Sequence, residues 1–211
     1  QEVAVAMRTS MRLFLNDVVW KTGSDYRRFF TEETVYLNDS IAPLFNIDLK
    51  KDSSFHPVRI DGGQRAGIIT HPYILSMLSY TDNTSPIHRG VFLSRNILGN
   101  VLQPPADAIA PLSDDVYPDL TTRERVTLQT KSTTCQTCHA MINPLGFALE
   151  EYDAIGRLRT TENRAGQAKP INANGNYQPR SGTEAVFHGG HELGHYLATE
   201  RDACETFVHS L

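Results

Sequence analysis

The segment Cys135-Gln136-Thr137-Cys138-His139 constrains this chain more than any other part of its sequence. Two thiols separated by two residues and followed directly by an imidazole form the C-x-x-C-H motif that attaches a c-type haem. In such a site Cys135 and Cys138 form thioether bonds to the porphyrin, and His139 is held below the ring as the proximal iron ligand. The motif therefore predicts one covalently attached haem c.

Two other uses of a C-x-x-C pair fit less well. A zinc site needs further thiolates or correctly spaced histidines, and the chain has only three cysteines in total. A thioredoxin-like redox pair lies in a βαβ context, which the sequence around residue 135 lacks. The third cysteine, Cys204, then has no internal partner, and we expect it to be a buried, small apolar residue.

The composition limits the class of protein. A chain of 211 residues, 40% hydrophobic and 21% charged, fits one large or two small globular domains. The net charge of −4 and the lack of a basic run predict no nucleic-acid binding, and no apolar run predicts a membrane span. Haem attachment to C-x-x-C-H takes place outside the cytoplasm. We therefore expect a periplasmic or extracellular protein from which an export signal or an upstream region has been removed.

The spacing of apolar residues predicts a mostly α-helical fold, and the C-x-x-C-H motif predicts that this fold contains a cytochrome c-like haem module. An irregular, proline-rich connector is expected over 103–118, and a small β-hairpin or loop over 172–182. The expected helices lie at 5–19, 24–30, 31–45, from Pro72 onward, at 87–98, from Thr121 into the motif, at 144–159 and at 190–211.

The residues after the motif resemble one protein family. Asn143-Pro144-Leu145-Gly146-Phe147-Ala148-Leu149-Glu150, followed by Asp153-Ala154-Ile155-Gly156-Arg157, is similar to the haem domain of the planctomycete-type cytochrome c proteins. These are large exported proteins assembled from several domains of unknown function. Upstream, residues 65–70, 84–90 and 103–105 are similar to the segment that leads into that haem domain.

The resemblance implies a division of the chain into three segments. Residues 1–50 would be the end of a preceding helical domain, and residues 51–165 the haem c domain. Residues 166–211 would begin a following small helical domain. The resemblance supplies a haem and an extracytoplasmic location, but it supplies no substrate.

Several side chains are candidates for contacts with the haem. Phe147 is a suitable apolar wall for a porphyrin. Arg157 and Arg159 could donate to the haem propionates, although each could equally pair with an Asp or a Glu of the chain. The carbonyl region of Pro144 is expected to bind the second ring nitrogen of His139.

The ligand opposite His139 decides what the haem can do. His71, His88 and Met77 lie in the upstream segment, and His71 is our candidate for the distal iron ligand. A held ligand favours electron transfer, whereas an open distal position would permit peroxidase-like or oxidase-like chemistry.

A second motif, His191-Glu192-Leu193-Gly194-His195, predicts a different class of protein. On a helix, the two histidines would face one zinc ion, with Glu192 as the general base of a metallohydrolase. The glycines before the motif are poor helix formers. The longer metallopeptidase pattern also fails, because Ala198 and Arg201 occupy its glycine and third-histidine positions.

The sequence therefore predicts a c-type cytochrome that transfers electrons through one haem and acts as a module rather than as a catalyst by itself. Its expected partner is a redox protein or the remainder of a longer chain, in a hetero-oligomeric or multidomain assembly. The alternatives are a peroxidase-like or oxidase-like haem enzyme with an open distal site, and a zinc hydrolase that uses His191, Glu192 and His195.

Overall fold

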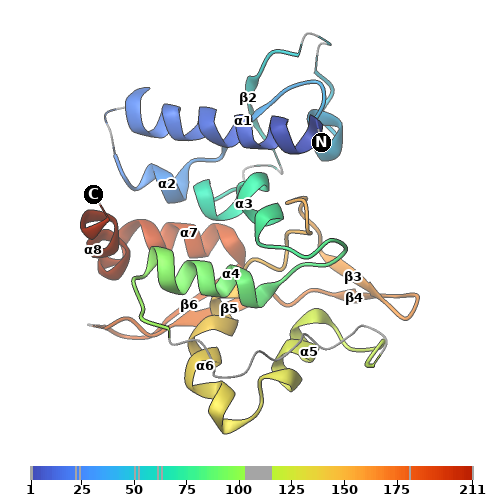
Figure 1. The fold of residues 1–211 in the computed structure, drawn as a ribbon, viewed down its shortest axis with the longest axis vertical. Helices are drawn as coiled ribbons and strands as arrows, with labels where there is room; N and C mark the ends of the chain where they lie inside the picture. The colour runs from blue at the N-terminus through green and yellow to red at the C-terminus, as the bar shows by residue number, and fades with distance from the viewer. Residues whose placement is uncertain are drawn as a thin grey trace.

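The fold is mostly helical, with short β-hairpins between the helices (Figure 1). The computed structural model describes residues 2–21, 23, 25–49, 51, 53–60, 62, 64–102, 116–180 and 182–210. Within these ranges the strands form two-stranded antiparallel sheets, and about half of the residues are helical. The prediction of a mostly α fold with small hairpins is confirmed. Most of the expected proline-rich connector, residues 103–115, lies outside the described residues.

The N-terminal part places one long helix across the top of the molecule in Figure 1. Helix α1 spans Glu2–Asn16 and continues into a π-helical turn, η1, at Asp17–Lys21. The short helix α2 spans Arg28–Thr31. The apolar face of α1 is buried through residues such as Met7, Met11 and Phe14, as its spacing predicted.

The prediction of a helix over 31–45 is wrong. The chain forms strand β1 at Thr34–Leu37, which pairs with β2 at His56–Arg59, and then a 3₁₀ turn, η2, at Ala42–Phe45. The segment from Thr34 to Tyr36 is β-branched and aromatic, which favours a strand. Short apolar runs of this kind do not distinguish helix from strand by their periodicity alone.

The central part stacks its helices in successive rows, with α3 above α4 and α6 at the bottom of Figure 1. Pro72 opens α3 and Pro86 opens α4, where a missing backbone N–H costs nothing. A capping box between Thr121 and Glu124 starts α5. The bounds are Gly67–Thr70 for the 3₁₀ turn η4, Pro72–Met77 for α3, Pro86–Phe92 for α4, Leu93–Ile97 for the π-helical turn η5, Thr122–Gln129 for α5 and Thr133–Phe147 for α6.

The C-terminal part contributes two hairpins and two helices. Strands β5 and β6 form the hairpin expected near residues 172–182, whereas the β3–β4 hairpin was not predicted. Cys204 is exposed on α8, so the expectation that it is buried is wrong. The bounds are Thr161–Arg164 for β3, Gln167–Pro170 for β4, Asn174–Tyr177 for β5, Ala185–His188 for β6, Gly189–Thr199 for α7 and Arg201–His209 for α8.

The main hydrophobic core joins residues from all three of the expected segments. Phe30 from α2, Leu145 and Leu149 at the end of α6, and Leu193 and Leu197 from α7 are all buried in one cluster. The C-terminal helices therefore pack on the middle of the chain. The domain boundaries at residues 50 and 165 stay a prediction.

Helices α4 and α6 cross at unusually close range, and glycines make this approach possible. A side-chain carbon at Gly90 would collide with the backbone carbonyl of Ile142, and one at Gly146 would collide with that of Pro86. Each helix therefore contributes a glycine that faces the backbone of the other. This crossing fixes the position of α6, which carries the C-x-x-C-H segment.

We expect Gly146→Ala to lower the free energy of unfolding by about 1–3 kcal/mol, because a backbone carbonyl cannot move aside as a flexible side chain can. Urea denaturation measures the loss. Gly182→Ala is the control, since its new methyl group would meet only the side chain of Pro179 at 3.3 Å, and it should change stability by less than about 0.5 kcal/mol. Equal stabilities of the two variants would contradict the close crossing.

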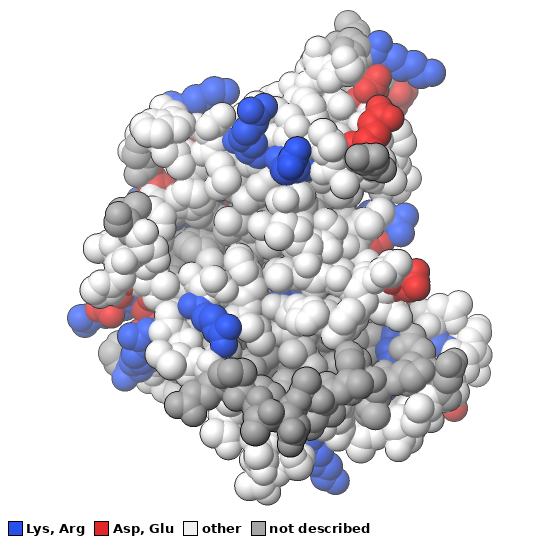
Figure 2. Space-filling view, viewed as in Figure 1, with Lys and Arg blue, Asp and Glu red and all other residues white. Residues whose placement is uncertain are grey.

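Two further features of the molecule are the distribution of its surface charges and the length of its helices. Figure 2 shows Lys, Arg, Asp and Glu side chains scattered around the drawn face, while the middle of that face is largely uncharged. In the described part of the chain, none of the helices has the length and apolarity needed to cross a bilayer.

Candidate functional site

Helix α6 brings Cys135, Cys138 and His139 onto one side of a single element. Ser132 caps the helix, because its hydroxyl oxygen accepts from the backbone N–H of Cys135 at 3.4 Å. The same hydroxyl donates to the Cys135 Sγ at 3.0 Å. Positions three and four apart share a helix face, so the two thiols and the imidazole lie together one turn into α6.

These three side chains are within reach of a ligand. All of them are half-buried, and both cysteines are free thiols rather than members of a disulfide. Two thiols and one imidazole on one helix face are the donor set that a c-type haem requires. The residues present therefore fit a haem attached through Cys135 and Cys138, with His139 next to the iron.

The imidazole of His139 is held by a side chain that the sequence did not predict. Its Nδ1 lies 2.9 Å from Oδ1 of Asn143, one helical turn further along α6. Pro144, whose carbonyl region was expected to have this role, lies inside the helix instead. Asn143 is buried and in turn donates from Nδ2 to the hydroxyl of Thr130 at 2.9 Å. A polar residue four positions after the histidine was the only signal for it.

One family model matches the part of the chain that holds this site. Residues 65–162 match PSCyt3, a protein of unknown function (DUF1588). This family is associated with planctomycete cytochromes c, so the match supports the resemblance at a coarse level. No curated protein and no solved structure matches the chain. The PSCyt3 match runs from the residues before η4 into β3, and it includes α5 and α6.

Within the PSCyt3 segment, Phe147 does not form an open wall. Its ring is buried, and the guanidinium carbon of Arg123 lies 4.4 Å from the ring centroid. Arg123 also donates to the backbone carbonyls of Asn172 and Asn174, at 3.0 and 2.7 Å. Phe147 therefore helps to join α5, α6 and the start of β5.

The two arginines expected near haem propionates bind acidic residues of the chain. Arg157 Nε donates to Oδ2 of Asp153 at 2.6 Å, on the surface of the loop that follows α6. Arg159 Nη2 lies 3.3 Å from Oε2 of Glu150. The structure thus shows the alternative pairing for both side chains and brings neither of them to the C-x-x-C-H segment.

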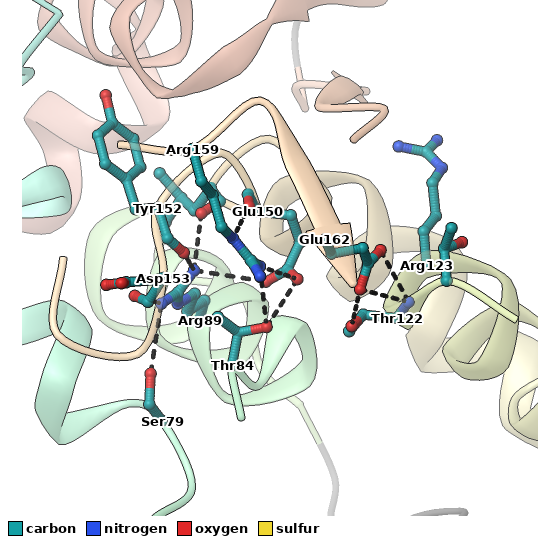
Figure 3. Close-up of polar contacts among 12 residues, drawn as sticks. Ser79, Thr84, Arg89, Thr122, Arg123, Glu150, Tyr152, Asp153, Arg159 and Glu162 are labelled. Carbon is teal, nitrogen blue, oxygen red and sulfur yellow. Dashed lines mark hydrogen bonds and ion pairs between the residues drawn. The ribbon is translucent and has the colours of Figure 1, made fainter. Parts of the chain in front are cut away.

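A buried arginine holds the loop after α6 in the PSCyt3 segment (Figure 3). Arg89, from α4, donates to three backbone carbonyls, those of Leu149, Tyr152 and Asp153, at 2.7–2.8 Å. Its Nη2 also lies 3.3 Å from the hydroxyl of Ser79. Burial lowers the pKa of Arg89 to about 10.

The carboxylate partner of this arginine is equally buried. Glu150 lies 3.3 Å from Arg89 Nη1 and 3.3 Å from Arg159 Nη2, and it accepts from the hydroxyl of Thr84 at 2.7 Å (Figure 3). Burial raises the pKa of Glu150, against the effect of the two arginines. The cost of desolvation therefore exceeds the attraction between the charges, as is common for buried pairs. Sequence reasoning did not predict this cluster.

A cavity of about 690 Å³ opens beside α5 and the β3–β4 hairpin. Its lining includes Leu128, Lys131 and Ile171, together with the carboxyl-bearing Glu150 and Glu162. None of the three C-x-x-C-H donors lines this cavity. This cavity and the thiol-bearing face of α6 are therefore different places, and we place the candidate site at the thiols because the donor chemistry lies there.

The structure does not bring His71 near the C-x-x-C-H segment. His71 caps α3 through Nδ1, which accepts from the backbone N–H of Tyr73 at 3.3 Å. Its Nε2 lies 3.4 Å from the hydroxyl of Ser10, and its ring packs on Phe14 of α1. In Figure 1, α4 lies between α3 and α6. Both ring nitrogens have partners, which opposes the expected role as a distal ligand.

The H-E-x-x-H motif lies outside the PSCyt3 segment, on α7. The rings of His191 and His195 lie 4.6 Å apart, and His191 Nε2 is 3.5 Å from a carboxylate oxygen of Glu33. Glu192 caps the helix by accepting from the backbone N–H of His188 at 2.7 Å. Across the described ranges, no group of three or more His, Cys, Asp or Glu side chains is arranged to hold a metal ion.

Proposed function

We propose that this chain is a c-type cytochrome module that transfers electrons through one haem attached to Cys135 and Cys138. The proposal rests on α6, which presents two free, half-buried thiols and the imidazole of His139 on one face. The PSCyt3 match supports a cytochrome-related role in general terms. A haem bound at such a site supplies exchange of one electron between ferric and ferrous iron.

The chain's own residues would perform the remaining tasks. Ser132 orients the thiol of Cys135 and anchors the start of α6. Asn143 orients the ring of His139. Gly90 and Gly146 hold α6 against α4 and thereby keep the two thiols at a fixed position on the molecule. A rigid support of this kind suits a site that must not rearrange when its charge changes.

The proposal also includes a location and a partner. Since C-x-x-C-H haem attachment takes place outside the cytoplasm, we propose a periplasmic or extracellular protein. Its electron donor or acceptor would be a redox protein or another part of a longer chain. His191 and His195 have no part in this proposal, because Glu192, the expected general base, accepts from the backbone N–H of His188 at the start of α7.

Expression with an export signal in a bacterium that matures c-type cytochromes tests the proposal. We expect one covalent haem per chain, a pyridine haemochrome spectrum of the two-thioether type, and sharp α and β bands on reduction. Cys135→Ala with Cys138→Ala should lose all covalent haem. Cys204→Ala, which removes the exposed thiol of α8, should keep it.

Four results would count against the proposal. A wild-type chain with no covalent haem, or a double variant that retains covalent haem, would contradict the assignment of Cys135 and Cys138 as the haem attachment sites. A high-spin spectrum that changes on addition of peroxide would favour the peroxidase-like alternative. Stoichiometric zinc without a Soret band would favour the hydrolase alternative.

A further inference from the structure

We propose that Thr130 and Asn143 form a hydrogen-bond relay that fixes His139 in the Nδ1–H tautomer, so that its Nε2 presents a lone pair. The two residues are positioning residues, since they act on a ligand only through His139. The role of the lone pair toward iron rests on the proposed function. The tautomer itself is a property of the chain and is tested separately.

The relay begins at the hydroxyl of Thr130, at the end of α5. Thr130 Oγ1 lies 2.8 Å from the backbone carbonyl oxygen of Val126. A carbonyl oxygen can only accept, so the single hydroxyl proton of Thr130 is donated to Val126. Toward every other neighbour, Thr130 Oγ1 can then only accept.

This restriction decides which way the amide of Asn143 points. One of the two terminal atoms of the Asn143 side chain lies 2.9 Å from Thr130 Oγ1. Because Thr130 Oγ1 must accept, this terminal atom is the donor Nδ2. The reversed amide would direct its carbonyl oxygen at an oxygen that has no proton left to give. Thr130 and Asn143 are both buried, where an unmade hydrogen bond costs most.

The orientation of the amide in turn decides the tautomer of His139. With Nδ2 directed at Thr130, Oδ1 of Asn143 faces Nδ1 of His139 at 2.9 Å. An amide oxygen only accepts, so Nδ1 carries the proton. The neutral ring then has its lone pair on Nε2, and in the described part of the chain this nitrogen has no hydrogen-bond partner.

The surrounding backbone keeps the relay in place. Gln136 Nε2 donates to the carbonyl oxygen of Thr130 at 2.6 Å, which ties the end of α5 to the first turn of α6. Separately from this contact, three consecutive hydrogen bonds connect the backbone of α5 to the ring of His139. They join Val126 to Thr130, Thr130 to Asn143, and Asn143 to His139. Such a chain in a buried setting is stronger than its members in isolation.

The relay has a consequence for a bound iron. A histidine that donates its other N–H to an oxygen is a more basic ligand, and it favours the more highly charged metal. Asn143 is therefore expected to lower the reduction potential of the haem. This role resembles that of the outer-shell partners that orient metal-bound histidines in general.

The first arm of the test uses the full chain with Cys135→Ala and Cys138→Ala, so that no haem attaches. Ring ¹⁵N chemical shifts of His139, measured where the ring is neutral, report its tautomer. We expect the Nδ1–H form. Asn143→Leu should shift the tautomer ratio about tenfold toward Nε2–H, the factor that corresponds to loss of one hydrogen bond. Thr130→Val should shift the tautomer ratio in the same direction, whereas Thr130→Ser, which keeps the hydroxyl, should retain the ratio of the parent chain.

The second arm uses the haem-loaded chain and does not depend on folding without haem. Asn143→Leu should raise the reduction potential, and Asn143→Asp, which keeps an acceptor and adds negative charge, should lower it. Solvent exchange of the His139 Nδ1 proton in the reduced protein should become about tenfold faster in Asn143→Leu.

The two proposals fail in different ways. An Nε2–H tautomer in the parent chain overturns the relay, as do Asn143→Leu and Thr130→Val variants with unchanged tautomer and unchanged potential. Absence of covalent haem from the wild-type chain overturns the proposed function, while the tautomer measurement still decides the relay.

Discussion

Arg89→Met is expected to lower the free energy of unfolding by about 3–5 kcal/mol, the usual effect of removing one partner of a buried ion pair. The side chain of Arg89 is completely buried, and that of Glu150 is 4% exposed. The substitution leaves Glu150 paired with Arg159 but no longer with Arg89. It also removes the N–H groups that donate to three backbone carbonyls. Methionine fills much of the volume, so the loss reports polar contacts rather than a cavity.

Two further variants separate charge from geometry. Arg89→Lys keeps the charge, but one ammonium group cannot reproduce the fork that binds several carbonyls, so we expect an intermediate loss. Arg157→Met is the matched control, because Arg157 is 55% exposed in its pair with Asp153 and should cost less than about 1 kcal/mol. Urea denaturation of all three variants gives the comparison. A loss in Arg89→Met no larger than in Arg157→Met would show that the buried cluster does not stabilise the fold.

The second large effect is an acid-dependent loss of stability caused by His71. Burial, and after it the positive charge of Arg65, lowers the pKa of His71 to about 3. In the unfolded chain a histidine has a pKa near 6.5. Between these values the unfolded chain binds a proton that the folded chain does not, so stability falls as the pH falls. The slope from this one group is about 1.4 kcal/mol per pH unit.

His71→Asn tests this expectation, because asparagine can still accept from the backbone N–H of Tyr73 at the start of α3 but does not titrate. The stability difference between wild type and variant should change by about 2 kcal/mol, in favour of the variant, between pH 6.5 and pH 4.5. His88→Asn, on the exposed face of α4, controls for the substitution and should preserve the wild-type slope. Parallel curves for wild type and His71→Asn would rule out the buried neutral imidazole.

Local patterns predicted much of the helical structure. Pro72 and the Thr121–Glu124 capping box each mark a helix start that the structure confirms. These signals are local because the first turn of a helix has backbone N–H groups without helical partners: proline lacks one of them, and the capping box accepts from two. The strand β1 was missed because its four residues fit a helix stripe as well as a strand, and its partner β2 begins 19 positions after β1 ends, from Leu37 to His56.

The site was predictable only in part. The two thiols and His139 follow from their spacing in the sequence, since one helix carries all three. Asn143 was missed because its role depends on the direction of an amide, which Thr130 of the preceding helix determines. The Arg89–Glu150 pair was missed because the two residues are 61 positions apart and meet only when α4 crosses α6.

Three of the contacts of Arg89 depend on the path of the chain and not on the identity of the side chains that it passes. The guanidinium binds carbonyl oxygens of Leu149, Tyr152 and Asp153, which every amino acid carries. Residues at these three positions can therefore change in evolution without loss of the contact, whereas Arg89 has no equivalent substitute. The course of the loop after α6 therefore depends on one side chain that belongs to a different helix, α4.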